Sequence, residues 1–136
     1  DNVYSWDKML AMQGNTAPYL QYAVARINSI FRKAQSQPED SFNIFQTYLS
    51  ESERNLFRKL IFFPVVLKQT VKELKPHFLC TYLYELSTDF SSFYNQNKVM
   101  VENEKIRSNR LLLCSQTILF LKTGMAILGI ETLQEM

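Results

Sequence analysis

The sequence predicts an all-α protein, a single-domain bundle of five to seven helices around one hydrophobic core. Apolar residues recur at three- and four-residue spacing along most of the 136-residue chain, which is the period of an amphipathic helix. With only three glycines and four prolines, the chain has too few turn formers for an all-β protein. The run Val65-Val66-Leu67 is too short for a strand and lies between helical stretches.

The first helices are delimited by capping residues. Ser5 can cap a short helix over residues 6–12, and Gly14-Asn15 is a typical helix stop. Thr16 then caps a second helix that has Pro18 in its first turn, where the missing N–H costs nothing. The apolar stripe of this second helix consists of Leu20, Ala23, Ile27, Ile30 and Ala34.

The polar residues 35–43 follow, and we expect them to form the most mobile loop. Ser50 and Glu53 make a capping box before the next helix, which Pro64 breaks or kinks. The second half of that helix ends before Lys75-Pro76. The following helix carries an apolar stripe spaced 4, 3, 4 and 3, formed by Leu79, Leu83, Leu86, Phe90 and Phe93.

The chain segment 95–97 ends that helix, and a last long helix runs over 104–128 until Gly129 stops it. Its stretch 111–130 is the most apolar of the sequence. Because Gln116 and Lys122 interrupt this stretch, we expect a buried helix and no membrane span. The whole chain, residues 1–136, therefore predicts one domain of 16.0 kDa.

Composition excludes several functional classes. Fifteen basic and thirteen acidic residues give a net charge of +2, which fits neither a polycation nor a disordered acidic tail. No charged and apolar leader of a signal peptide is visible, and the start at Asp1 indicates a piece of a longer protein.

No residue set predicts catalysis or metal binding. Cys80 and Cys114 lie far apart in the sequence and are expected to be buried apolar residues, as in a reducing compartment. His77 follows Pro76 at a helix start, where exposure or capping is the expected role. Glu85 and Asp89 lie one helical turn apart and should form a solvated face.

Charge and aromatic residues point to nucleic acid. Between Arg54 and Lys75 there are six basic residues and one acid, and such a patch attracts phosphate, although most lysine-rich helix faces are only solubilising. Tyr19 and Tyr22 lie three residues apart on one helix face, with Arg26 one turn further. Flat rings beside a guanidinium suit unpaired bases, while both tyrosines could equally be residues at the edge of the core.

The string G-N-T-A-P-Y-L-Q-Y-A-x-A-R-I, at residues 14–27, resembles the start of the C-terminal helical domain of arginyl-tRNA synthetases. Pro76, the run 82–86 and Phe93-Tyr94 look like the middle helix of that family. The run 110–113 and the ending 128–136 look like its last helix and tail. The resemblance covers the whole chain and identifies it as similar to the DALR-type anticodon-binding domain of this class I synthetase family.

The resemblance implies a function for the complete protein. The family attaches arginine to its tRNA with ATP and Mg²⁺, on a catalytic domain whose H-I-G-H-like and K-M-S-K-S-like signatures are absent from this sequence. This chain is therefore expected to hold no cofactor or metal and to have no catalytic residue. Its expected partners are arginine tRNA and the catalytic domain of the same polypeptide, without membrane or DNA. A cytoplasmic, monomeric domain is expected.

Seven candidate RNA-binding residues come from the resemblance. Those matching the family pattern are Tyr19, Tyr22, Arg26, Tyr94 and Met136. Where a family pocket has an aromatic residue four positions after the tyrosine, this sequence has Lys98, which offers a phosphate contact instead. Arg110 follows Ser108-Asn109, which replace the usual small apolar pair, so Arg110 is either an RNA contact or a helix-surface residue.

Two other functions remain open. One is a helical scaffold that docks to the catalytic domain or to another protein and makes little direct contact with RNA. The other is a DALR domain of a related synthetase, such as one for cysteine, against which the string at residues 14–27 argues.

Overall fold

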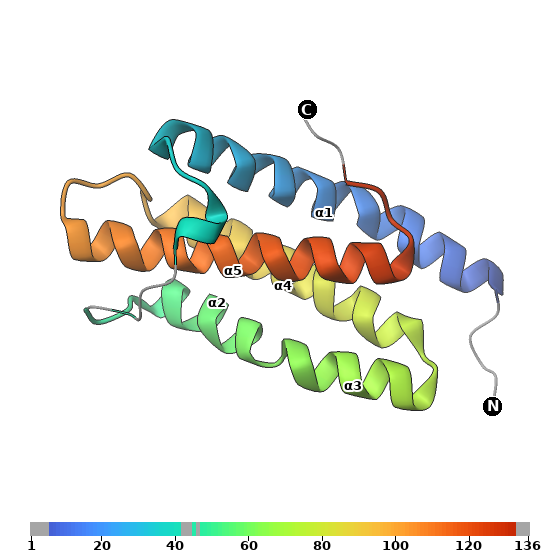
Figure 1. Ribbon diagram of the computed structural model, residues 1–136. Coiled ribbons are helices and arrows are strands. Elements are labelled where there is room, and N and C mark those ends of the chain that lie inside the picture. Colours follow the sequence, from blue (N-terminus) through green and yellow to red (C-terminus); the bar gives the residue numbers. More distant parts are fainter. Residues whose placement is uncertain (1–5, 42–44, 46, 133–136) are drawn as a thin grey trace.

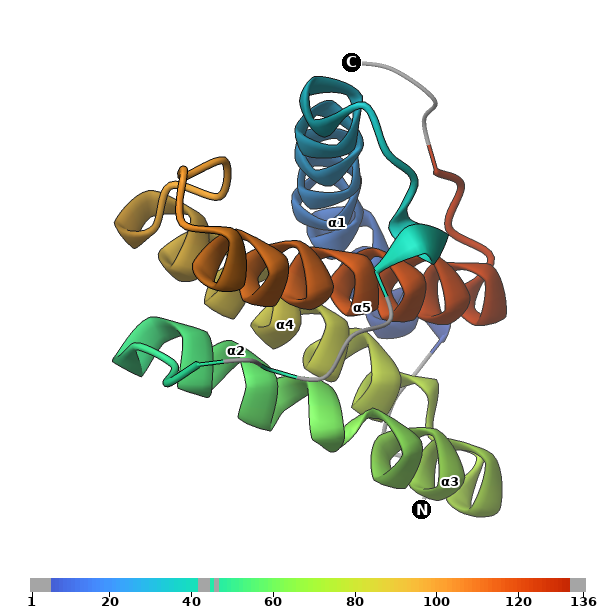
Figure 2. The same ribbon diagram turned by 60° about the vertical axis from the view of Figure 1, so that its left-hand side comes forward.

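The computed structural model describes residues 6–41, 45 and 47–132, which form five α-helices and one 3-10 helix. The elements are α1 (Trp6–Ala34), η1 (Pro38–Asp40), α2 (Glu51–Ile61), α3 (Phe63–Glu73), α4 (Pro76–Gln96) and α5 (Glu104–Leu128). Figures 1 and 2 show a bundle in which α1 lies on one side of α4 and α5, and the α2–α3 pair lies on the other. These described residues contain no strand, so the predicted all-α class is confirmed.

α1 is one continuous helix of 29 residues, so the predicted stop at Gly14-Asn15 is wrong. Its buried residues Met9, Thr16 and Leu20 are spaced seven and four apart, and one stripe therefore crosses Gly14 without a break. Pro18 removes the N–H that would bond to the carbonyl of Gly14, at a cost of about 3 kcal/mol. Burial of apolar side chains on both sides offsets this cost, since each contributes about 1.5–3 kcal/mol.

The predicted kink and capping box are both present between residues 50 and 74. Ser50 accepts a hydrogen bond from the backbone N–H of Glu53, and the Glu53 carboxylate accepts from the N–H of Ser50. α2 ends at Ile61, and Pro64 lies in the first turn of α3. The Tyr82 hydroxyl donates to the carbonyl of Lys59 at 2.6 Å, which ties α4 to the last turn of α2.

α1, α4 and α5 supply most of the core. All five residues of the predicted stripe from Leu79 to Phe93 are 0–1% exposed, and the two cysteines are buried, as predicted. α5 ends at Leu128, and Gly129 has a φ of 75°, the left-handed conformation that glycine adopts freely. Gly124 allows α4 and α5 to approach closely, because a Cβ there would lie 2.6 Å from Leu83 Cδ1.

By length and composition alone, α5 could also cross a membrane, with 44% of its most apolar window buried in the bundle. Core helices of globular proteins have the same composition, and α5 packs against α1, α2 and α4. In the predicted loop 35–43, the structure places η1, whose Pro38 carbonyl accepts a hydrogen bond from Ser115 at 2.7 Å. Residues 42 and 43 of that loop lie outside the described residues.

Candidate nucleic-acid interface

Tyr19 and Tyr22 lie on a side of α1 that is open to solvent. Their side chains are 58% and 54% exposed, whereas Leu20 and Ala23 beside them are buried. The three-residue spacing places both rings on one side of the helix, at the border of the buried stripe. α1 therefore presents two aromatic rings outward from a rigid helix.

Arg26 lies between an aromatic ring of α1 and one of α4. Its guanidinium donates to the Tyr22 hydroxyl at 2.7 Å, and its central carbon lies 4.9 Å from the centroid of the Tyr22 ring. On the other side, the same carbon lies 4.2 Å from the centroid of the Tyr94 ring. Tyr94 stacks in turn on Phe90, which is 1% exposed, with their centroids 6.2 Å apart. The fold thus holds the Arg26 guanidinium against two aromatic rings.

This Tyr22–Arg26–Tyr94 cluster is electrostatically suited to an anion. A guanidinium carries five N–H donors, of which the bond to Tyr22 uses one. Among the described residues no carboxylate forms an ion pair with Arg26. A phosphate or the edge of a base could accept from the remaining donors.

Next to this cluster, α1 and α4 enclose a groove. Tyr19 meets Tyr84 edge to face with centroids 5.3 Å apart, and Tyr84 is 42% exposed. The cavity has a volume of about 540 Å³. It is lined by Pro18, Tyr19 and Tyr22 from α1 and by Tyr84, Ser87, Thr88 and Ser91 from α4. Rings and small hydroxyl side chains form the walls of this groove, which suits a flat ligand with polar edges.

The sequence identified Tyr84 only as part of the family-like middle helix and did not suggest the hydroxyl residues beside it. Tyr84, Thr88 and Ser91 follow one another at four and three residues, a second stripe next to the buried one. That spacing was visible in the sequence. Its meaning depended on α1 packing along this side of α4, which no local pattern specifies.

Arg110 is held inside the fold. Its Nε donates to the Glu53 carboxylate at 2.8 Å, and its Nη1 donates to the carbonyl of Lys98 at 2.6 Å. The side chains of Arg110 and Glu53 are only 15% and 4% exposed. Arg110 therefore links α5 to α2 and to the chain that follows α4, and it does not join the Tyr22–Arg26–Tyr94 cluster in the described structure.

The last two candidates lie outside that cluster or outside the described structure. Lys98 is exposed two residues after α4 ends at Gln96, so the turn-by-turn spacing from Tyr94 does not extend to it. Met136 lies outside the described residues. The chain after α5 does return to α1, because the Gln21 side chain donates to the carbonyl of Glu131 at 2.9 Å.

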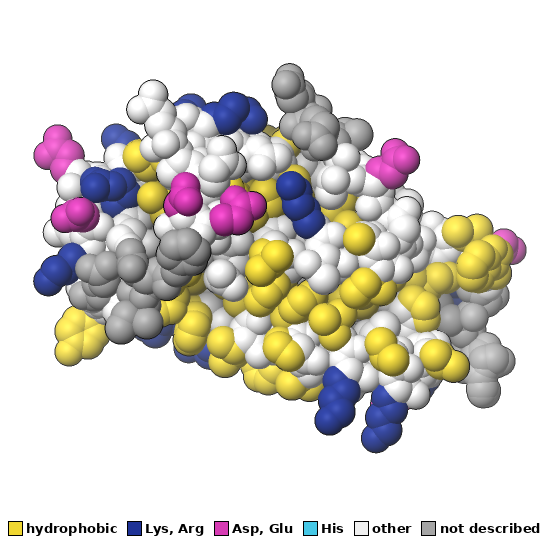
Figure 3. Space-filling view, in the orientation of Figure 1, with side chains coloured by type: hydrophobic (Ala, Val, Ile, Leu, Met, Phe, Trp, Pro, Cys, Tyr) yellow, Lys and Arg dark blue, Asp and Glu magenta, His cyan; other side chains and the backbone are white. Residues whose placement is uncertain are grey.

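Some cations of the basic segment 54–75 bond within the protein, and others are open to solvent. Figure 3 shows Lys and Arg side chains scattered along the edges of the visible face. Arg54 donates to the carbonyl of Leu49 at 2.7 Å, and Lys59 forms an ion pair with Glu85 at 2.9 Å. Lys68 and Lys72 are exposed on α3. Several cations counted in the sequence are therefore partly occupied by the protein itself.

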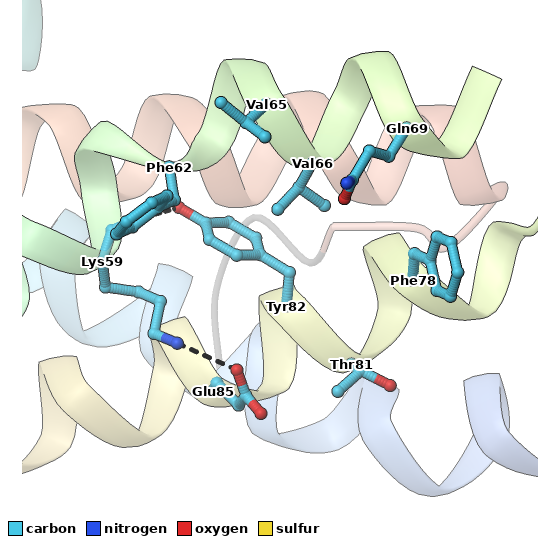
Figure 4. Close-up of a pocket in the computed structure, with 9 residues that line it drawn as sticks. All are labelled: Lys59, Phe62, Val65, Val66, Gln69, Phe78, Thr81, Tyr82 and Glu85. Carbon is cyan, nitrogen blue, oxygen red and sulfur yellow. Dashed lines mark hydrogen bonds and ion pairs between the residues drawn. The ribbon is translucent and has the colours of Figure 1, made fainter. Parts of the chain in front are cut away.

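A second cavity, of about 390 Å³, lies between α2–α3 and α4 (Figure 4). Phe62, Val65 and Phe78 line it, and the Lys59–Glu85 ion pair crosses one side. Glu85 thus pairs with lysine instead of forming a purely solvated face with Asp89. Burial raises the pKa of Asp89, and the Glu85 carboxylate raises it further, while Lys59 lowers it. Lys59, the one cation that lines this cavity, is already paired with Glu85, so the cavity is a poor site for RNA phosphate.

Chemically reactive groups are shielded. Burial raises the pKa of the Cys114 thiol and, against a hydrogen bond with Thr16, that of Cys80, so both stay protonated at neutral pH. His77 is partly buried with its ring 4.8 Å from that of Phe78. The described residues contain no group of three or more side chains that could hold a metal ion.

Comparison with known proteins adds a family match and close relatives to these structural observations. Residues 20–136 match the model of a family described as the DALR anticodon binding domain. The arginine–tRNA ligase of Haemophilus ducreyi is 46% identical over 136 residues, which cover 100% of this chain and 24% of that protein. That of Prochlorococcus marinus strain NATL2A is 46% identical over 133 residues, which cover 98% of this chain and 22% of that protein.

Solved structures of synthetases also superpose on this chain. Thermus thermophilus arginyl-tRNA synthetase superposes with a TM-score of 0.77 and 31% identity, covering 88% of this chain and 21% of that one. The Plasmodium falciparum arginyl-tRNA synthetase gives a TM-score of 0.76 and 36% identity, covering 98% and 23%. The chain thus spans about a quarter of the length of the curated relatives it matches.

Proposed function

The chain belongs to the DALR anticodon-binding domain family, and we propose that it binds the anticodon stem and loop of arginine tRNA as one part of an arginine–tRNA ligase. In this proposal the ligase joins arginine to the tRNA, and this chain contributes RNA binding without any catalytic residue. The catalytic domain of the same polypeptide uses ATP and Mg²⁺. The protein acts in the cytoplasm, and this domain is a monomer.

The observation that carries the proposal is the Tyr22–Arg26–Tyr94 cluster beside the groove between α1 and α4. Recognition of unpaired RNA needs flat surfaces for the bases and cations for the backbone, and the cluster offers both within a few ångströms. Because both helices are packed into the core, the rings need little ordering when RNA binds.

In this proposal each residue of the interface has a separate role in RNA binding. An anticodon base that leaves its stack enters the groove and packs on Tyr19 or Tyr22. The Thr88 hydroxyl, which donates its proton to the carbonyl of Tyr84, accepts a hydrogen bond at the edge of the base. Arg26 donates to the adjacent phosphate or to a base edge. Lys98 contacts the backbone of the loop. Arg110 acts indirectly, by holding the chain around Lys98 in place.

Substitution of Tyr22 tests the proposal. Tyr22→Ala removes one stacking surface and the hydrogen bond to Arg26, so affinity for arginine tRNA should fall by about 1–3 kcal/mol, or about 5- to 150-fold. Fluorescence anisotropy with labelled tRNA measures the affinity, and circular dichroism checks the helix content. Tyr48→Ala is the matched control, because Tyr48 is 99% exposed and belongs neither to the groove nor to the Tyr22–Arg26–Tyr94 cluster.

Arg26→Gln adds a second arm to the same experiment. Loss of one phosphate contact should weaken binding and reduce the slope of log affinity against log salt by about 1. If Tyr22→Ala and Arg26→Gln bind as the parent chain does with intact helicity, the RNA role of this face is wrong. The scaffold function then becomes the better explanation of the fold.

A further inference from the structure

A third cavity lies where the last turns of α1 meet η1 and α5, the region where the chain leaves α1 in both ribbon views (Figures 1 and 2). Its volume is about 370 Å³, and Phe31, which is 3% exposed, lines it from the core. Most of the other lining side chains are polar, and they include Asn28, Gln35, Gln37, Arg32 and Lys122. Two of these are cations from different helices, and among the described residues no carboxylate lines the cavity.

The chain after α1 is held tightly around this cavity. Gln35 has a φ of 55°, and the N–H of Ser36 donates to the carbonyl of Phe31 at 3.2 Å, which closes the end of α1. On the opposite wall, the Ser115 hydroxyl of α5 donates to the carbonyl of Pro38 at 2.7 Å. These bonds fix η1 against α5, so the walls of the cavity need little ordering when a ligand binds.

The two cations of the cavity have no acidic partner in the described structure. Neither Arg32 nor Lys122 forms an ion pair there, and both side chains are exposed. The acids nearest to Arg32 in the sequence, Glu39 and Asp40, belong to η1, and the Asp40 carboxylate accepts from the N–H of Gln37 at 3.1 Å. Two like charges that face one cavity repel each other, and an anion between them replaces this repulsion by attraction.

Stabilisation of helix ends explains only one of these cations. Arg32 lies in the last turn of α1, where a positive charge is favourable. Lys122 lies more than one turn before the end of α5 and has no such role. Together with the amide side chains of Asn28 and Gln35, the two cations form a set of N–H donors, which matches the acceptor oxygens of a phosphate group.

Exposed cations connect this cavity with the Tyr22–Arg26–Tyr94 cluster. Lys33 is exposed seven residues after Arg26, about two turns further on the same side of α1. Arg32 lies about 15 Å along the helix axis from Tyr22 and about 80° around it. Figure 3 shows Lys and Arg side chains along the edge of the molecule above the second half of α1. A positively charged path therefore leads over the outer side of α1 from the cluster to the cavity.

We propose that the cavity between α1, η1 and α5 binds a backbone phosphate of the RNA whose unpaired bases enter the groove between α1 and α4. This inference rests on the proposed function and adds a second anchoring point to it. A phosphate contact reads no sequence, but it fixes the orientation of the RNA on the protein. With the bases held at Tyr22 and a phosphate held by Arg32 and Lys122, one RNA hairpin is fixed across α1 at two points.

Removal of both cations tests the proposal. Arg32→Gln combined with Lys122→Gln should weaken binding of a labelled anticodon stem-loop of arginine tRNA about tenfold at low salt. The slope of log affinity against log salt should fall by about 1. Fluorescence anisotropy over a range of salt concentrations measures both quantities in the 136-residue chain, and circular dichroism checks the helix content.

The matched control is Lys68→Gln combined with Lys72→Gln, which removes the same charge from exposed positions of α3. This control should change the affinity and the slope much less. Equal effects of the two double variants would overturn the proposal, because only net charge would then matter. Arg32→Lys in the otherwise unchanged chain keeps the charge and should keep the slope.

Ethylation interference locates the phosphate on the RNA. In the parent chain, ethylation of at least one phosphate of the stem-loop should inhibit binding, and this inhibition should disappear in the Arg32→Gln, Lys122→Gln variant. In Tyr22→Ala the same phosphate should still interfere. An interference pattern that is identical in the parent and in the double variant would overturn the proposal.

Inorganic phosphate distinguishes RNA from a free anion as the ligand. If the cavity takes only free phosphate, then phosphate shifts the NMR signals of residues 32–37, while the double variant binds the stem-loop as the parent does, and the proposal is wrong. The Tyr22→Ala experiment stays separate. Loss of affinity in Tyr22→Ala alone supports the proposed function and refutes the phosphate site, whereas loss in the double variant alone supports the phosphate site and refutes the role of the aromatic face.

Discussion

Arg26 was predicted to contact RNA, and Arg110 either to contact RNA or to lie on the helix surface, and the two side chains occupy opposite surroundings. Arg26 lies between two rings at the surface with donors to spare. Arg110 is 15% exposed and gives its Nε to a carboxylate that is 4% exposed. A guanidinium already neutralised by a buried acid offers a ligand little net charge. We therefore infer that Arg26 contacts RNA directly and that Arg110 positions the chain near Lys98.

The Glu53–Arg110 pair gives a residue-scale prediction. Arg110→Ala leaves the Glu53 carboxylate buried without its cation, and the free energy of unfolding should fall by about 3 kcal/mol. Glu53→Gln combined with Arg110→Ala should lose less than the sum of the single losses, by at least about 1 kcal/mol. Urea unfolding followed by circular dichroism measures the cycle, and Lys68→Ala on α3 is the control with no expected change. Strictly additive losses would contradict the coupling.

Two helical glycines give a prediction at the scale of elements. Gly14 has open space around its Cβ position in the middle of α1, so Gly14→Ala should stabilise the chain by up to about 1 kcal/mol through helix propensity. Gly124 faces Leu83, with a hypothetical Cβ 2.6 Å from Cδ1. Gly124→Ala should therefore destabilise by about 1–3 kcal/mol despite the same gain in propensity.

Thermal unfolding of the two variants side by side measures this difference. Because the substitution is chemically identical, only the surroundings of the two helices can give effects of opposite sign. If Gly14→Ala destabilises as much as Gly124→Ala, then α1 needs its glycine, and the stop predicted from the sequence would have a physical basis after all.

The sequence predicted most helix boundaries because local signals and packing agree there. Ser50-to-Glu53 capping, the Pro64 kink and the Gly129 stop are each fixed by a few neighbouring residues. At Gly14 the local sequence signal and the packing of the helix disagree. A glycine followed by asparagine resembles a helix end, but the buried stripe through Met9, Thr16 and Leu20 keeps the helix intact. That stripe could be recognised only once α4 was known to pack along α1.

At the scale of the whole molecule, the candidate site was predictable within one helix and not between helices. Spacing alone placed Tyr19, Tyr22 and Arg26 along one side of α1. The contact of Tyr94 with Arg26 and that of Tyr84 with Tyr19 join residues more than sixty positions apart in the sequence. Such contacts depend on how α1 crosses α4, which is set by the fit of many buried side chains.

The arrangement of surfaces predicts how much of a tRNA the domain touches. Its aromatic groove and the Arg26 guanidinium lie on one face, and some of the α2–α3 cations are paired within the protein. We therefore expect the isolated chain to bind an anticodon stem-loop of arginine tRNA within about threefold of the whole tRNA. If this chain is part of a ligase as proposed, contacts at both ends of the tRNA would act together there, and the stem-loop should bind that ligase far more weakly than the whole tRNA does.

Competition in fluorescence anisotropy distinguishes these cases, with the stem-loop and the whole tRNA as unlabelled competitors against one labelled probe. A stem-loop of the same length with a fully paired loop is the control, since it keeps the phosphates but removes the unpaired bases. The paired-loop control should compete poorly if base stacking in the groove contributes to affinity. If only charge contributes, it should compete as well as the stem-loop with an open loop. If the whole tRNA binds the isolated chain tenfold or more tightly than the stem-loop does, RNA must contact surfaces beyond the α1–α4 face. The exposed lysines of α3, Lys68 and Lys72, would then be the first residues to replace.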